Sequence, residues 1–235
     1  MIHSIPFYVS LVFASTTLLS IFLFLVAIRK SSSETTRKKT VSIFIGIVVW
    51  LALQSFFSLN NYYSSDTTVF PPKIVLLGVL PMLVFVVLLF IFPTGRRFID
   101  SLPLKYLTLI HVVRIPVELV LYFLFVYKTV PELMTFTGRN FDILAGLTAP
   151  IIYYFGYVKQ KLNRTILIIW NLISLGLLLN IVINALLSAP SPIQQFAFDQ
   201  PNTAILYFPF SLLPTFIVPV VLFAHFVTLR QLFKK

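Results

Sequence analysis

Apolar residues in this sequence are gathered into seven long stretches, separated by short polar gaps. Within each stretch nearly every position is apolar, rather than every second one, so the pattern predicts helices and not the alternating strands of a membrane barrel. The stretches are 18 to 25 residues long, close to the length that an α-helix needs to cross the hydrocarbon core of a bilayer. They cover residues 5–28, 40–59, 74–93, 104–127, 141–158, 165–188 and 205–229.

These stretches take up most of the chain, so we expect residues 1–235 to form one all-α membrane domain, a bundle of seven transmembrane helices. The first stretch is too long for the apolar core of a typical signal peptide, and no cleavage signal follows it before Arg29, so we expect it to be retained. Only 11% of the residues are charged, against about 25% in an average chain. We therefore expect an integral protein of a plasma membrane or a bacterial inner membrane, with the lipid bilayer as its main partner.

The basic residues are distributed unevenly among the gaps. Of the 18 Lys and Arg residues, fourteen lie in the first, third and fifth gaps and at the C-terminal end, while Lys73, Lys128 and Arg139 lie in the other gaps. Because basic loops tend to stay on the cytoplasmic side, we expect the N-terminus outside and the C-terminus in the cytoplasm. This clustering at helix ends also accounts for the net charge of +11, so no nucleic-acid partner is needed to explain it.

The fourth stretch contains charges that membrane topology does not explain. His111, Arg114, Glu118 and Tyr122 fall within an arc of about 80° on one helix face. Arg114 and Glu118 are four residues apart, so we expect these two side chains to pair. An arginine and an acid near the centre of a span together cost roughly 5–7 kcal/mol, which about cancels the contribution of the apolar residues. This face should therefore pack inside the bundle or line a wet cavity.

Polar residues of two other stretches are expected at the depth of Glu118. We predict a ligand-binding site made of Arg114, Glu118, Tyr122, Gln54 and Asn180. Within it, Arg114 would hold an anionic group of a small molecule, or Glu118 would exchange a proton or a cation. The competing interpretation is an internal ion pair that only locks the bundle, with the amides making pairwise hydrogen bonds between helices.

Prolines and a charged loop indicate how a ligand would reach this site. Pro116 lies between the two charges and removes a backbone donor near Val112, and the last stretch contains three more prolines. Broken helices of this kind supply hinges and open carbonyls in transporters. Arg139 and Asp142, at the outer end of the fifth stretch, form either a charged entrance or, with Asn140 as N-cap, the start of a helix.

Two histidines support a different hypothesis. His111 lies about 9 Å inward of Lys105 and His225 about 8 Å inward of Arg230, at a rise of about 1.5 Å per residue, so the two rings are expected at similar depth. Two imidazoles on different helices can ligate haem b or a metal ion, which would make the chain a membrane redox protein. A single histidine in a membrane more commonly makes a hydrogen bond between helices.

Several classes of function find no support in the sequence. There is no cysteine, which excludes disulfides, thiolate metal sites and cysteine nucleophiles. We find no P-loop, no zinc-protease or serine-hydrolase motif, and no lysine near the centre of a stretch that would carry retinal. The sequence thus leaves the question of an enzyme open, and it favours a protein that is not one. A third hypothesis is a non-catalytic membrane subunit or sensor that works in a homo- or hetero-oligomer.

Overall fold

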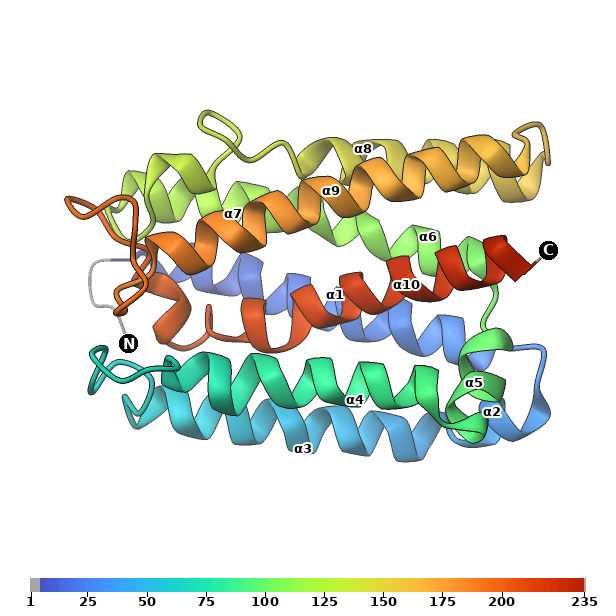
Figure 1. The fold of residues 1–235 in the computed structure, drawn as a ribbon, viewed down its shortest axis with the longest axis horizontal. Helices are drawn as coiled ribbons and strands as arrows, with labels where there is room; N and C mark the ends of the chain where they lie inside the picture. Colours follow the sequence, from blue (N-terminus) through green and yellow to red (C-terminus); the bar gives the residue numbers. More distant parts are fainter. Residues whose placement is uncertain (1–4, 235) are drawn as a thin grey trace.

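The computed structural model describes residues 5–234, and this part of the chain contains helices and no strands. The predicted all-α class is confirmed. The long helices run side by side in an elongated bundle, with α3 and α4 along one side, α8 and α9 along the opposite side, and α1 and α10 between them (Figure 1).

Long helical segments occupy all seven predicted stretches. Some of these segments contain a short 3₁₀ or π turn, which divides them into consecutive elements. The elements are α1 (Phe7–Arg29), α3 (Thr40–Leu59), η1 and α4 (Val75–Val79 and Leu80–Ile91), α6, η2 and α7 (Leu104–Ile110, His111–Val113 and Arg114–Val126), α8 and η4 (Ile143–Ile152 and Tyr153–Val158), α9 (Arg164–Ser188), and η6 and α10 (Leu213–Ile217 and Val218–Lys234). The shorter elements between them are α2 (Glu34–Lys38), α5 (Pro93–Asp100), η3 (Glu132–Met134) and η5 (Ala204–Leu206).

Five of the described helices are long and apolar enough to cross a membrane. These are α1, α3, α6 to α7, α9, and η6 to α10. A sixth candidate joins η1 and α4 to α5, which are bent by 91° relative to each other, and the apolar helix Ile143–Val158 is shorter than the rest. The last stretch was expected to begin at residue 205, but continuous helix begins only at Leu213. The reason is that Pro209 and its neighbours form turns rather than helix.

The bend between α4 and α5 has a local cause. Phe92 is extended (φ −79°, ψ 139°) because the residue before a proline avoids the helical conformation, and Pro93 then starts α5. The turn is tight enough that a Cβ atom on Gly95 would lie 2.4 Å from the carbonyl oxygen of Leu89. The sequence therefore turns the chain sharply here and places the basic residues of α5 at one end of the bundle, close to α2 (Figure 1).

The segment that precedes α8 determines the position of the candidate site. Helix α8 begins about midway along the bundle, and the chain before it folds back beside α7 (Figure 1). The turn η3 in this segment contacts both α7 and α9. As a result, the first residues of α8 lie partway along the length of the bundle and not at its end.

Candidate functional site

Arg114 lies at the junction of η2 and α7, and only 3% of its side chain is exposed. Pro116, two residues further on, was expected to disturb the helix near Val112. The structure has a 3₁₀ turn at this point, His111–Val113, followed by regular helix from Arg114. Arg114 is therefore the first residue of α7, directly after this turn.

The guanidinium of Arg114 connects four helical segments. Its Nη1 atom donates hydrogen bonds to Oδ1 of Asp142, at the start of α8, over 3.0 Å and to the carbonyl oxygen of Ser174 in α9 over 3.1 Å. Its Nη2 atom lies 2.7 Å from Nε2 of His225 in α10. The salt bridge that the sequence predicted between Arg114 and Glu118 is therefore not formed. Asp142 takes that place, because α8 begins at the same depth as Arg114.

The hydrogen-bond partners of His225 define its tautomer. Arginine has only donors, so Nε2 of His225 must be the acceptor toward Arg114. The ring proton is then on Nδ1, which donates to Oδ1 of Asn171 over 2.7 Å. The imidazole is thus a neutral link between α7 and α9, and both of its nitrogens are already in use.

Glu118 lies one turn after Arg114 and is held by Asn140. The side-chain amide of Asn140 donates to Oε1 of Glu118 and, over 3.0 Å, to the carbonyl oxygen of Met134. Its Oδ1 atom accepts the backbone N–H of Asp142 over 3.0 Å. The second carboxylate oxygen of Glu118, Oε2, is buried and has no hydrogen-bond partner within residues 5–234. Of the two carboxylates in the cluster, only that of Asp142 is paired with a cation.

The two histidines come together, but not as metal ligands. The rings of His111 and His225 are stacked, with centroids 4.1 Å apart and planes 30° apart. Stacked rings do not direct their nitrogens at one shared atom, and Nε2 of His225 faces the guanidinium of Arg114, which repels a cation. In the described part of the chain no group of three His, Asp or Glu residues suits a metal ion. The residues therefore do not fit the haem or metal site considered above.

The remaining predicted site residues lie elsewhere. Gln54 binds the hydroxyl of Tyr63 and the carbonyl oxygen of Leu77, so it belongs to a separate contact between α3 and η1. Tyr122 stacks on Phe136, with ring centroids 5.1 Å apart. The sequence placed both residues correctly on a helix but could not determine the neighbour that each one meets.

The expected entrance pair is also separated. Asp142 is buried against Arg114, whereas Arg139 is exposed, with its guanidinium carbon 5.7 Å from the ring centroid of Phe196. Asn180 does not join the cluster either, because its side chain donates to the carbonyl oxygen of Arg139 over 2.8 Å. The charged entrance was predicted because the helix was expected to begin at the end of the bundle, but α8 begins midway along it (Figure 1).

Two members of the cluster were missed as site residues. Asn140 was expected to be the N-cap of a helix, and Asn171 was not among the predicted site residues. The inward face of α9 is the one with Asn171 and Ser174, which are buried. A useful signal was available, because Asn171 is spaced three residues from Ser174 and both are polar residues within an apolar stretch.

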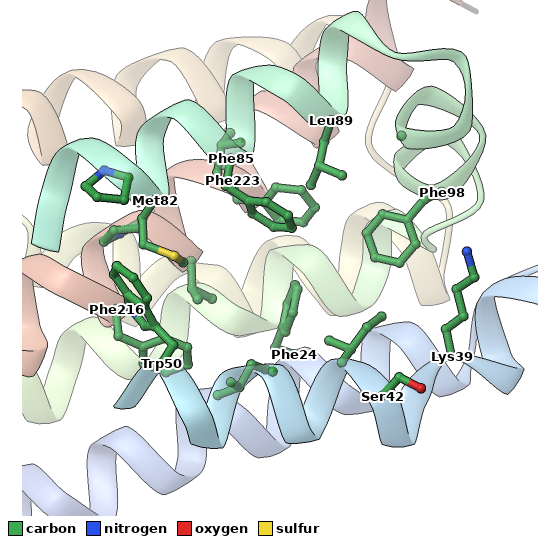
Figure 2. Close-up of a pocket in the computed structure, with 18 of the residues that line it drawn as sticks. Phe24, Lys39, Ser42, Trp50, Met82, Phe85, Leu89, Phe98, Phe216 and Phe223 are labelled. Carbon is green, nitrogen blue, oxygen red and sulfur yellow. The ribbon is translucent and has the colours of Figure 1, made fainter. Parts of the chain in front are cut away.

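A groove of about 600 Å³ opens in a different part of the molecule, between α3, α4 and α10 (Figure 2). None of the cluster residues Arg114, Glu118, Asn140, Asp142 and His225 lines it. The polar cluster and the groove are therefore two separate features.

A family model described as a domain of unknown function (DUF8737) matches residues 71–233, a range that includes the whole polar cluster. No curated protein and no solved structure matches this chain.

Proposed function

We propose that this chain, which belongs to the DUF8737 family of domains of unknown function, is a membrane protein that binds or transports a small solute or ion by exchanging a proton or cation at Glu118. It would cross the membrane seven times, with the N-terminus outside and the C-terminus in the cytoplasm of a plasma or bacterial inner membrane. Seven crossings agree with α1 beginning at one end of the bundle and α10 finishing at the other (Figure 1).

The charge balance of the cluster is the main support for Glu118 as the exchanging group. Arg114 and Asp142 neutralise each other across 3.0 Å. An ionised Glu118 adds a second negative charge with no cation of its own, and an uncompensated buried charge costs several kcal/mol. Binding of a proton or a small cation removes that cost. The free Oε2 atom of Glu118 is the single observation on which the proposal depends.

Arg114 is a weaker candidate for holding an anionic ligand. Both of its terminal nitrogens already donate to protein groups, and only Nε has no partner within residues 5–234. An anion would therefore meet one free donor, and it would have to displace Asp142 or His225 to gain a second. Arg114 instead acts as a fixed positive charge that holds α7, α8, α9 and α10 in register around Glu118. Movement of the helices relative to one another would use the irregular turns at His111–Val113 and Leu213–Ile217, since such turns are frequent at functional hinges.

Flux through reconstituted vesicles tests this proposal. Purified protein would be placed in liposomes with an internal pH dye, and a gradient of H⁺, Na⁺ or K⁺ would be imposed. We expect a flux in wild-type vesicles that Glu118→Gln abolishes, because glutamine keeps the shape and the Asn140 contact but cannot exchange a charge. The matched control is Glu132→Gln, an exposed glutamate in η3, which should leave the flux unchanged.

The result that contradicts the proposal is equally direct. If Glu118→Gln folds and conducts like wild type, Glu118 is not the exchanging group. If the variant lowers thermal stability but wild-type vesicles show no flux and no ion-dependent change at Glu118, the cluster only locks the bundle.

A further inference from the structure

The groove between α3, α4 and α10 has an apolar wall and one polar end. Figure 2 shows the aromatic rings of Phe24, Phe85 and Phe223 along its length, with Lys39 and Ser42 at one end and Trp50 at the other. The indole Nε1 of Trp50 donates to the carbonyl oxygen of Thr215 over 2.9 Å, which ties α3 to η6 at that end. The groove is therefore bounded at one end by this contact and at the other by Lys39 and α5.

The groove exists because α3 stands away from the core. Helix α3 packs on α1 and α2, and most of its surface is exposed. Gly46, halfway along the groove, has no heavy atom within 4 Å of the position that a Cβ would take. A side chain at this position would occupy the groove, so the glycine keeps it open.

The dimensions fit a single lipid tail. From Lys39 to Trp50 the groove follows α3 for eleven residues, which is roughly 16 Å at 1.5 Å per residue. Half of the hydrocarbon core of a bilayer is about 15 Å thick. A groove of this length, on a helix that crosses a bilayer, would extend through one leaflet from the level of the head groups to the middle of the membrane.

The charge at the polar end favours an anionic head group. Lys39 lines the groove and makes no ion pair within residues 5–234, whereas its neighbour Lys38 pairs with Glu34 over 2.8 Å. Arg96 and Arg97 lie in α5, at the same end of the bundle. Basic residues at this level attract anionic lipids, and they disfavour the cationic part of a zwitterionic head group.

We infer that this groove binds one acyl chain of an anionic phospholipid from the adjacent leaflet, with the phosphate at Lys39 and the end of the chain at Trp50. A second copy of the chain fits less well, because it would bury the free charge of Lys39 in an apolar interface. This site does not depend on ion exchange at Glu118, but it rests on the membrane crossing that is part of the proposed function.

Quenching of Trp50 fluorescence by brominated lipid measures occupancy of the groove. The sequence has two tryptophans, so Trp170→Phe leaves Trp50 as the single reporter. We expect phosphatidylglycerol brominated near the chain end to quench Trp50 more strongly than phosphatidylcholine with the same chains, at equal mole fractions. The preference should be roughly fivefold in relative affinity, the factor for about 1 kcal/mol from one basic residue near the membrane surface.

Two pairs of variants separate the head-group and chain contributions. Lys39→Gln should remove the preference for phosphatidylglycerol, while Lys38→Gln should keep it. Gly46→Leu should reduce quenching by both lipids, while Gly176→Leu should not, because Gly176 is an equally open helical glycine on α9, outside the groove.

Equal quenching of wild-type Trp50 by the two lipids would overturn the inference, because the groove would then hold any lipid that surrounds the protein. Quenching that is unchanged by Gly46→Leu would overturn it as well. If Gly46→Leu does not fold, the Lys39→Gln and Lys38→Gln pair still decides the question.

Discussion

Helix α10 has two faces with opposite chemistry. On one face, His225 lies in a buried polar cluster, and both of its ring nitrogens have a protein partner. On the other face, Val220 and Phe223 line an open groove that contains almost no polar atoms. The two faces show two ways of organising a membrane bundle. The cluster connects helices through directed hydrogen bonds, and the groove leaves open space between helices, for example at Gly46.

Removing the negative charge of Asp142 is the change that should destabilise the polar cluster most. In Asp142→Asn, Arg114 remains buried without a charged partner, which costs about 3–5 kcal/mol of stability. The unfolding midpoint in detergent micelles should fall accordingly. Asp199→Asn, an exposed aspartate, is the matched control and should change the midpoint little.

The double variant Arg114→Met with Asp142→Leu sharpens this test. Replacing a buried ion pair with apolar groups of similar size is often neutral or stabilising, so much of the lost stability should return. If the single variant Asp142→Asn is as stable as wild type, the ion pair does not hold the bundle together.

A smaller loss of stability distinguishes the polar cluster from the groove directly. His225→Leu removes the acceptor for Arg114 and the donor for Asn171, and leaving such buried groups unpaired costs about 1–3 kcal/mol. Phe85→Leu in the groove changes a side chain that is 55% exposed, so its cost should stay within about 0.5 kcal/mol. Equal unfolding midpoints for the two variants would show that the regions do not differ in the way described.

The sequence predicted the long helices better than it predicted the polar cluster. The apolar stretches predicted the long helices well, and α3 begins and ends at the predicted residues 40 and 59. Long apolar runs can satisfy their backbone groups in a bilayer only as helices, so this part of the fold is determined locally. The 91° bend at Phe92 was not predicted, although Pro93 marks its position.

The members of the cluster were only partly predictable. Arg114, Glu118 and His225 were recognised because charged or polar groups within apolar stretches are rare. The partner of Arg114 was not found, because Asp142 reaches it only through the backward fold of the chain before α8. Such a fold depends on long-range contacts, for example those of Asn140, which periodicity and spacing do not reveal.

A small effect is expected at Asp100, in the contact between α5 and α10, which lies outside the groove. Asp100, at the end of α5, accepts hydrogen bonds from Arg230 over 2.9 Å and from Lys234, both in α10. Burial raises the pKa of Asp100, but these two cations outweigh it, so the pKa lies below its usual value. The contribution to stability is therefore complete above the pKa of the unfolded chain. It is lost as the pH falls through the lower pKa of the folded state.

Because these groups are partly exposed, the loss should stay within about 1 kcal/mol. It should appear as a small fall in the unfolding midpoint under acidic conditions, which Asp100→Asn eliminates. A midpoint that falls equally with acid in Asp100→Asn would assign the effect to other carboxyl groups.

The most direct test of the account is an infrared difference spectrum of the purified protein in lipid, recorded while the pH or the Na⁺ or K⁺ concentration is changed. If Glu118 exchanges a proton or cation, the wild-type spectrum contains carboxyl bands that Glu118→Gln removes and Glu132→Gln retains. Identical spectra for wild type and Glu118→Gln would contradict the claim that Glu118 is the exchanging group.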